Sequence, residues 1–211
     1  MVRSSRPDTD DLAAQTEPFQ GLQRFERQAP VRQISYYLCG ELLEPQYYTE
    51  LLYTLRTASD TDLIYLHLNS QGGDFNTGLQ IINNIAASAA RVVTVLEARA
   101  YSMAALIFLS GDEYLVHDNC QLMFHTYSGV FAGRGNESQA EITAVGAWFD
   151  KVMRRICTPF LSSAEVDQIM KGADVWMDSD EIRQRMTQRV ASSSRRVPAG
   201  KKTRPAPDGQ G

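Results

Sequence analysis

The 211-residue chain has few cysteines and no long hydrophobic run. Its three cysteines, Cys39, Cys120 and Cys157, are widely spaced, and none forms a Cys-X-X-Cys pair. The sequence therefore predicts neither a disulfide framework nor a structural metal site. No apolar run approaches the roughly 20 residues that span a bilayer, and the first residues have no apolar segment of the secretory type. We expect a reducing, cytoplasmic location and no membrane contact.

The sequence also lacks the phosphate-binding pattern Gly-X4-Gly-Lys-[Ser/Thr]. That pattern is the one in which backbone N–H groups hold nucleotide phosphates in many ATP-using proteins. Any use of ATP would therefore have to come from a separate partner.

Charge is unevenly distributed between the body of the chain and its end. Residues 189–211 carry six basic residues and one acidic residue, net +5, although the whole chain is −4. This Ser-, Pro- and Gly-containing tail has too few apolar side chains to form a core, so we expect it to be disordered. An electrostatic contact with nucleic acid or an acidic partner is one interpretation, and a solvated tail is the commoner outcome.

The polar residues 1–30, which contain Pro7, Pro18 and Pro30, are expected to form a flexible N-terminal arm. Residues 31–188 then remain as a single domain.

Strands and helices alternate along that domain. We expect strands at 34–39, 63–68, 91–96, 113–116 and 121–124, and helices at 45–55, 74–90 and 103–109. Such alternation predicts right-handed crossovers and a parallel sheet, which is an α/β fold.

A longer helix is predicted over residues 136–159. Its apolar residues are spaced by three and four positions, as in a heptad seam: Ile142, Val145, Phe149, Val152 and Ile156. Short helices with capping boxes follow at 162–170 and 179–186. Because few other elements remain to cover it, the stripe either closes the domain's own core or packs against another subunit.

Two features point to nucleophilic catalysis. The strand at 63–68 runs towards Gly72 and Gly73, where the missing Cβ allows a backbone to approach a ligand closely. Ser102 opens the apolar helix at 103–109, beside N–H groups that carry partial positive charge. Together they suggest a serine nucleophile beside an oxyanion hole.

A serine nucleophile needs a base, usually a histidine held by a carboxylate. His67 lies within a strand and His117 in a polar turn, whereas His125 ends a short apolar strand. We therefore favour His125, the alternative being an ordinary core histidine. The acid remains open among five residues: Asp118, Asp150, Asp167, Asp174 and Asp178. Asp174 is the most attractive, because the apolar residues 175–177 should bury it and a buried acid generally has a partner.

Four motifs resemble those of the Clp protease proteolytic subunit family, in the same order and with the same spacing. They are Asn69-Ser-Gln-Gly-Gly73, Ala100-Tyr-Ser-Met-Ala-Ala105, Met123-Phe-His125 and Asp174-Val-Trp-Met-Asp-Ser-Asp-Glu181, and the similarity covers about residues 33–187. The resemblance implies a crotonase-like spiral of ββα units with a projecting handle helix. It also implies an ATP-dependent serine endopeptidase with a Ser102, His125 and Asp174 triad, whose oxyanion hole is formed by the N–H groups of Gly73 and Met103.

The same resemblance implies a homo-oligomer of two stacked heptameric rings around a chamber, a tetradecamer. The stripe from Ile142 to Ile156 falls where the interlocking handle would be. A polypeptide substrate would add as a β-strand beside residues 128–135, and the contact residues expected are Gly72, Ser128, Gly129, Val130 and Phe131. No cofactor or metal is implied, and an ATP-driven AAA+ unfoldase is a candidate partner.

The sequence departs from the family at three places. Gln71 stands where the family has proline, Thr126-Tyr127-Ser128 follows the histidine in place of Gln-Pro, and both terminal arms are longer. In these features the chain is similar to Clp-like proteases encoded by bacteriophages, some of which process capsid or scaffold proteins.

Two other function classes stay open. A crotonase-fold acyl-CoA enzyme would need a catalytic Glu or Asp pair near the glycine turn, and the sequence has none there. A catalytically silent, ring-forming subunit would not need the triad residues, all of which are present.

Overall fold

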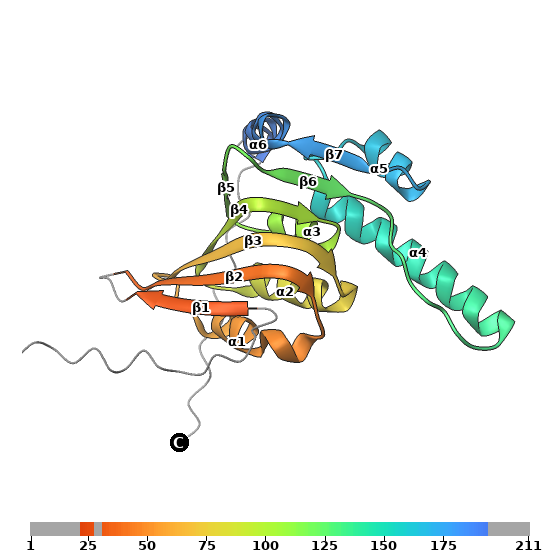
Figure 1. Ribbon diagram of the computed structural model, residues 1–211, viewed down its shortest axis with the longest axis horizontal. Coiled ribbons are helices and arrows are strands. Elements are labelled where there is room, and N and C mark those ends of the chain that lie inside the picture. Colours follow the sequence, from red (N-terminus) through yellow and green to blue (C-terminus); the bar gives the residue numbers. More distant parts are fainter. Residues whose placement is uncertain (1–21, 28–30, 194–211) are drawn as a thin grey trace, which may run out of the picture.

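The computed structural model describes residues 22–27 and 31–193 (Figure 1). In chain order the elements are β1 (Leu22–Arg27), β2 (Gln33–Leu42), the 3-10 helix η2 (Pro45–Tyr48), α1 (Thr49–Thr57), β3 (Leu63–Gly73), α2 (Phe75–Ala87), β4 (Arg91–Tyr101), α3 (Met103–Phe108), β5 (Glu113–Val116), β6 (Gln121–Phe124), α4 (Gly135–Cys157), α5 (Ser163–Met170), β7 (Val175–Asp178) and α6 (Ser179–Ser193).

One seven-stranded sheet organises the molecule and confirms the α/β class. Its strand order is β1-β2-β3-β4-β6-β7, with β5 paired to β4 beside β6. The pairs among β2, β3, β4, β5 and β6 are parallel, as the sequence predicts. The two edge strands, β1 and β7, are antiparallel to their neighbours, so the sheet is mixed rather than wholly parallel.

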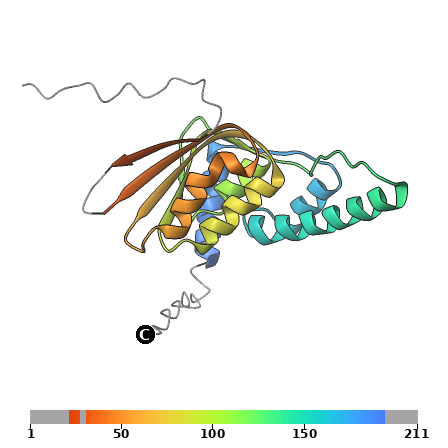
Figure 2. The ribbon, with the colours of Figure 1, turned by 90° about the horizontal axis from the view of Figure 1, so that it is seen from below.

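The core lies between this sheet and the helices on one of its faces. Figure 2 shows α1, α2 and α3 side by side against that face. Alternate residues of β2 and β3 point into it and are 0–1% exposed: Ile34, Tyr36, Leu38, Ile64, Leu66 and Leu68. Every residue of α3 is buried, as expected for a helix that is apolar on all sides.

Helix α4 projects away from the sheet (Figure 1), and its apolar stripe is divided. Phe149 is only 5% exposed, and Val152 and Ile156 pack against the same core, whereas Ile142 near the far end is 38% exposed. Phe149 thus packs on the subunit's own core, which is one of the two outcomes that the sequence left open, and an interface role for the other four stripe residues stays a prediction. Val145 is half-buried.

The expected domain limits shift at both ends. Strand β1 lies inside the segment interpreted as an N-terminal arm, and the remaining residues before 31 are outside the described part. Helix α6 runs to Ser193, so residues 189–193 of the expected tail are helical, and the rest of that tail is also outside the described part. Among the described residues, no helix is long and apolar enough to cross a membrane.

Candidate active site

Ser102 occupies a strained turn between strand β4 and helix α3. Its φ of 55° and ψ of −124° make it the one non-glycine residue with positive φ in the described part of the chain. Such a conformation costs about 1–3 kcal/mol and persists where the surrounding structure imposes it, often at functional sites. A sharp strand-to-helix turn is also how hydrolases expose a nucleophilic serine.

The glycine pair at the end of β3 is required by close contacts. A Cβ on Gly72, which has a φ of +88°, would lie 2.6 Å from the Tyr101 carbonyl oxygen and 2.9 Å from the Ser102 Cβ. A Cβ on Gly73 would lie 2.3 Å from the carbonyl oxygen of Leu42. The backbone of β3 thus comes directly against the serine turn, which a larger residue at either position would prevent.

Two backbone N–H groups are placed to receive an oxyanion. Met103 is the first residue of α3, so its N–H has no helical carbonyl to bind. Gly73 and Met103 line the same pocket as Ser102. The N–H of Ser102 itself donates to the Met123 carbonyl at 2.8 Å, so Gly73 and Met103 remain the candidate donors for the site.

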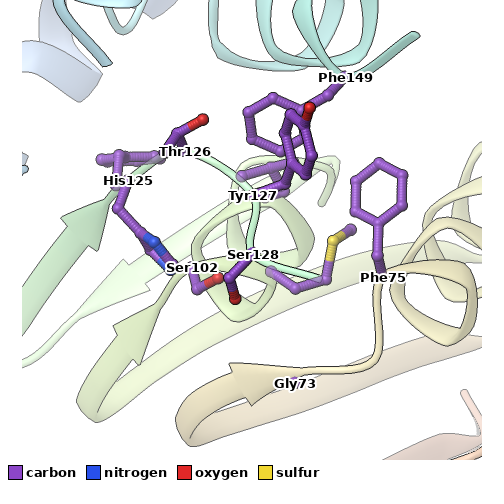
Figure 3. A pocket seen from close by; sticks show the side chains of 11 residues that line it. Gly73, Phe75, Ser102, His125, Thr126, Tyr127, Ser128 and Phe149 are labelled. Carbon is purple, nitrogen blue, oxygen red and sulfur yellow. The ribbon is translucent and has the colours of Figure 1, made fainter. Parts of the chain in front are cut away.

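His125 is the histidine that the fold brings to Ser102. It follows the last residue of β6, and Figure 3 shows its imidazole pointing toward Ser102. Within residues 22–27 and 31–193, neither the Ser102 hydroxyl nor the His125 ring makes a hydrogen bond. Catalytic hydrogen bonds are often long in ligand-free structures and shorten when substrate binds.

The other two histidines are engaged elsewhere. His67 Nδ1 lies 2.6 Å from a carboxylate oxygen of Glu97, and His117 Nε2 lies 3.5 Å from the other oxygen of the same residue. The His67 ring also stacks on Tyr37, with the ring centres 4.3 Å apart. Neither histidine lines the Ser102 pocket.

The strand register favours Asp174 as the acid. Strands β6 and β7 are antiparallel with Phe124 opposite Val175, so the next pair outward is His125 with Asp174. Directly opposite residues have Cβ atoms about 5 Å apart when the ladder continues. The ladder ends at Phe124, and no hydrogen bond joins the two side chains among the described residues.

The other four candidate acids already have partners. Asp118 pairs with Arg183, Asp150 and Asp167 both pair with Arg154, and the Asp178 carboxylate accepts the N–H groups of Asp180 and Glu181 at the start of α6. Asp174 alone has no hydrogen-bond or ion-pair partner in the described residues.

The expectation that residues 175–177 bury Asp174 is wrong. Asp174 is exposed, and Trp176 is 50% exposed, while Met177 is buried. The physical reason is the period of two along an edge strand. Met177 faces the core, so Trp176 and Asp174 face the other way.

An apolar pocket of about 70 Å³ opens beside Ser102. Its walls come from several elements: Phe75, Met103, Leu106, Phe124, Tyr127 and Phe149. The Phe149 ring centre lies 5.7 Å from that of Phe75 and 5.3 Å from that of Tyr127, and Figure 3 shows the three rings around one side of the pocket.

Sequence reasoning missed most of these walls and assigned Phe149 to an interface. The available signals were positional, because Phe75 follows the glycine pair by two residues and Tyr127 follows His125 by two.

The expected substrate contacts divide into two groups. Ser128 lines the pocket and Gly72 packs against Ser102. Gly129, Val130 and Phe131 do not line it. They lie in the irregular segment between β6 and α4, where Val130 is 98% exposed.

A strained serine and a histidine aimed at it, in one pocket on an α/β sheet, are typical of the serine hydrolase class of site. Sequence comparison gives the family: the Clp protease family model matches residues 39–185, so the chain belongs to the Clp protease family. It is 30% identical over 133 residues to the ATP-dependent Clp protease proteolytic subunit of Lactococcus lactis subsp. cremoris (strain SK11), covering 60% of this chain and 66% of that protein.

It is also 30% identical over 134 residues to the subunit of the same name from Streptococcus mutans serotype c (strain ATCC 700610 / UA159), covering 60% of this chain and 67% of that protein. The aligned region thus spans about two thirds of the length of these relatives.

Proposed function

We infer that this protein is a serine endopeptidase of the Clp type, with Ser102 as nucleophile, His125 as base and Asp174 as the acid that orients His125. The observation that carries this proposal is the pocket shared by Ser102, His125, Gly73 and Met103. The strained turn at Ser102 supports it, because a conformation costing about 1–3 kcal/mol needs a reason to persist.

The reaction follows from the roles of these groups. His125 takes the Ser102 proton as the hydroxyl oxygen attacks the peptide carbonyl, and the N–H groups of Gly73 and Met103 stabilise the oxyanion. His125 then protonates the leaving amine, which departs and leaves an acyl group on Ser102. Water, deprotonated by His125, attacks this ester and restores the serine.

Asp174 would act by holding the imidazole in one tautomer. Its position opposite His125 in the strand register supports this role, and its exposure requires that the carboxylate approach Nδ1 from the outer face of the sheet. The walls of the pocket further suggest that an apolar side chain next to the scissile bond is preferred, since six of the lining residues are apolar or aromatic.

The quaternary proposals follow from the family. We propose a crotonase-like spiral fold, stacked rings enclosing the active sites, and α4 as the handle between rings, contacting its partner through the exposed half near Ile142. An ATP-driven unfoldase would supply unfolded polypeptide. The departures at Gln71 and after His125 support a bacteriophage-type member that processes capsid or scaffold proteins.

One observation favours a second candidate, a silent ring-forming subunit. The carboxylate of Asp174 is exposed and, within the described residues, makes no hydrogen bond or ion pair with His125, so the triad is not hydrogen-bonded in the single subunit. An acyl-CoA enzyme of the crotonase type gains no such support, because no aspartate or glutamate lines the pocket among the described residues.

The test is hydrolysis of short fluorogenic peptides by Ser102→Ala and a matched control, Ser128→Ala. Loss of the nucleophile should reduce turnover by about 10⁶, by analogy with other serine triads, and leave assembly intact. Ser128 lines the same pocket but takes no part in the proton transfers, so its variant should raise KM while its turnover stays far above that of Ser102→Ala. A Ser102→Ala enzyme with more than about a tenth of the wild-type rate would contradict the assignment.

A further inference from the structure

A second pocket, of about 430 Å³, lies between helices α2, α4 and α6. It shares no lining residue with the Ser102 pocket. Two neighbours on α4 mark the division, because Trp148 lines the second pocket and Phe149 lines the first. The volume lies within the range of about 300–1,000 Å³ that is usual for small-molecule sites.

The walls of this second pocket are largely apolar. Leu79 and Ile82 come from α2, and Trp148, Val152 and Ile156 come from α4. An aliphatic chain placed here would be removed from water, a gain of about 25 cal/mol for each Å² of apolar surface buried.

The charged groups that line the pocket are two arginines, Arg155 and Arg189, and no aspartate or glutamate is among the lining residues. Arg155 makes no hydrogen bond or ion pair with any residue of the described ranges 22–27 and 31–193. Two positively charged side chains beside an apolar wall are complementary to a ligand that carries an anionic group on an aliphatic chain.

Arg189 has one hydrogen-bond donor that is unpaired among the described residues. Its Nη2 donates to the Leu109 carbonyl oxygen at 3.1 Å, and its guanidinium lies 5.5 Å from the centre of the Tyr114 ring. Its Nη1 is buried and has no partner among the described residues. A buried, charged donor without an acceptor is costly, and a carboxylate in the pocket would satisfy it once the guanidinium turns so that this covered nitrogen faces the pocket.

We propose that this pocket binds an aliphatic carboxylate, with the carboxylate on Arg189 and Arg155 and the chain against α2 and α4. The tail of the same chain is a poor occupant, because residues 194–211 carry five basic residues and one acidic residue and would be repelled. The proposal is independent of the proteolytic function, since binding here requires none of the Ser102 machinery.

The test is isothermal titration calorimetry of the full-length protein with octanoate and with 1-octanol. Octanoate should bind at least about tenfold more tightly, because only the carboxylate can satisfy the guanidinium groups. Arg189→Gln should weaken octanoate binding by about tenfold or more and leave the affinity for 1-octanol unchanged.

Lys151→Gln is the matched control. Lys151 is an exposed residue of α4 that does not line the pocket, and its loss removes the same charge. Octanoate affinity should be unchanged in this variant. If Arg189→Gln does not fold, Arg155→Gln replaces it, because Arg155 is exposed and makes no contact that folding would need.

Three results would overturn the proposal: no octanoate binding at millimolar concentration, equal affinity for octanoate and 1-octanol, or undiminished octanoate binding in the arginine variants. A fourth is dissociation of the native oligomer by Arg155→Glu together with no octanoate binding to the wild type. That outcome would mean that another copy of the chain occupies the pocket.

Discussion

Two histidine and carboxylate arrangements lie at different places on this sheet, and they differ in what surrounds them. His67 and Glu97 are 2.6 Å apart, and His117 contacts the same carboxylate. His125 and Asp174 make no hydrogen bond or ion pair within the described residues, yet His125 shares a pocket with the strained Ser102 and with Gly73 and Met103. Among the described residues, no serine hydroxyl makes a hydrogen bond with the tighter pair. The proposal that His125 is the base thus rests on the groups that converge around it and not on the closeness of a histidine to an acid.

The largest effect on the hydrolysis rate should come from replacing each of the two histidines, His125 and His67, with alanine in turn. His125→Ala removes the base and should reduce peptide hydrolysis by about 10⁶, comparable to loss of the nucleophile. His67→Ala removes a ring that stacks on Tyr37, so stability should fall while the rate per folded enzyme stays within about threefold of wild type. Steady-state kinetics, with the folded fraction and the thermal stability taken from circular dichroism, measures both. Equal losses of hydrolysis rate in the two variants would contradict the proposed difference between His125 and His67.

The acids give the next largest effect. Asp174→Asn should slow hydrolysis by about 10⁴ with the fold intact, because His125 then loses the partner that fixes its tautomer. Glu97→Gln should leave the rate near that of wild type, since neither of its histidines lines the pocket. If Asp174→Asn hydrolyses peptides at an undiminished rate, another acid orients His125, and Asp178 would be tested next.

The divided stripe of α4 offers a third contrast. Phe149→Glu buries a charge among Phe75 and Tyr127 and should lower the free energy of unfolding by about 3 kcal/mol or more. Ile142→Glu changes an exposed residue, so stability should be retained while stacked rings separate. Thermal denaturation and analytical ultracentrifugation distinguish the two effects. If Phe149→Glu keeps the wild-type stability but no longer assembles, Phe149 belongs to the subunit interface and not to the core.

The smallest effect concerns a carboxylate whose role is structural. The Asp62 side chain is 7% exposed and accepts bonds from Arg32 Nε and Nη2 at 3.1 and 2.7 Å. The Arg32 guanidinium lowers the pKa of Asp62 to about 2. Asp62→Asn should lower the free energy of unfolding at pH 7 by about 1–2 kcal/mol, allowing for the partial exposure of Arg32, and leave the hydrolysis rate unchanged.

The sign of the pH dependence follows from the lowered pKa. The stabilisation by Asp62 is present above its unfolded pKa of about 3.9 and is lost as the pH falls towards 2. Urea denaturation of wild type and Asp62→Asn should therefore give a difference that shrinks between pH 4 and 2. Asp60→Asn, an exposed neighbour, is the control and should show no such trend.

Much of the fold could be predicted because its central elements have strong local patterns. The strands 113–116 and 121–124 have the predicted limits, and α5 and α3 each end within one residue of theirs. The edge strands β1 and β7 were missed, because an edge strand packs one face only and its apolar alternation is weak. The sequence Leu-Gln-Arg-Phe-Glu-Arg of β1 is an example.

The sequence indicated the glycine pair and the serine of the candidate site, but it did not indicate the apolar residues that line the pocket. The glycine pair and Ser102 can be recognised from the residues next to them in the sequence, because their positions depend on turn geometry. The apolar walls come from α2, α3, α4 and the segment after β6, which only the tertiary fold brings together. The exposure of Asp174 depends on which face of β7 meets the core, and a four-residue strand leaves that choice to packing.

The proposed function requires Ser102 to be an activated nucleophile, and labelling with a fluorophosphonate followed by peptide mapping in a mass spectrometer tests this. Only a serine activated by a base should react. We predict one adduct per chain, on Ser102, that disappears in His125→Ala and persists in His67→Ala. An unlabelled wild-type protein, or an adduct on a serine other than Ser102, would contradict it.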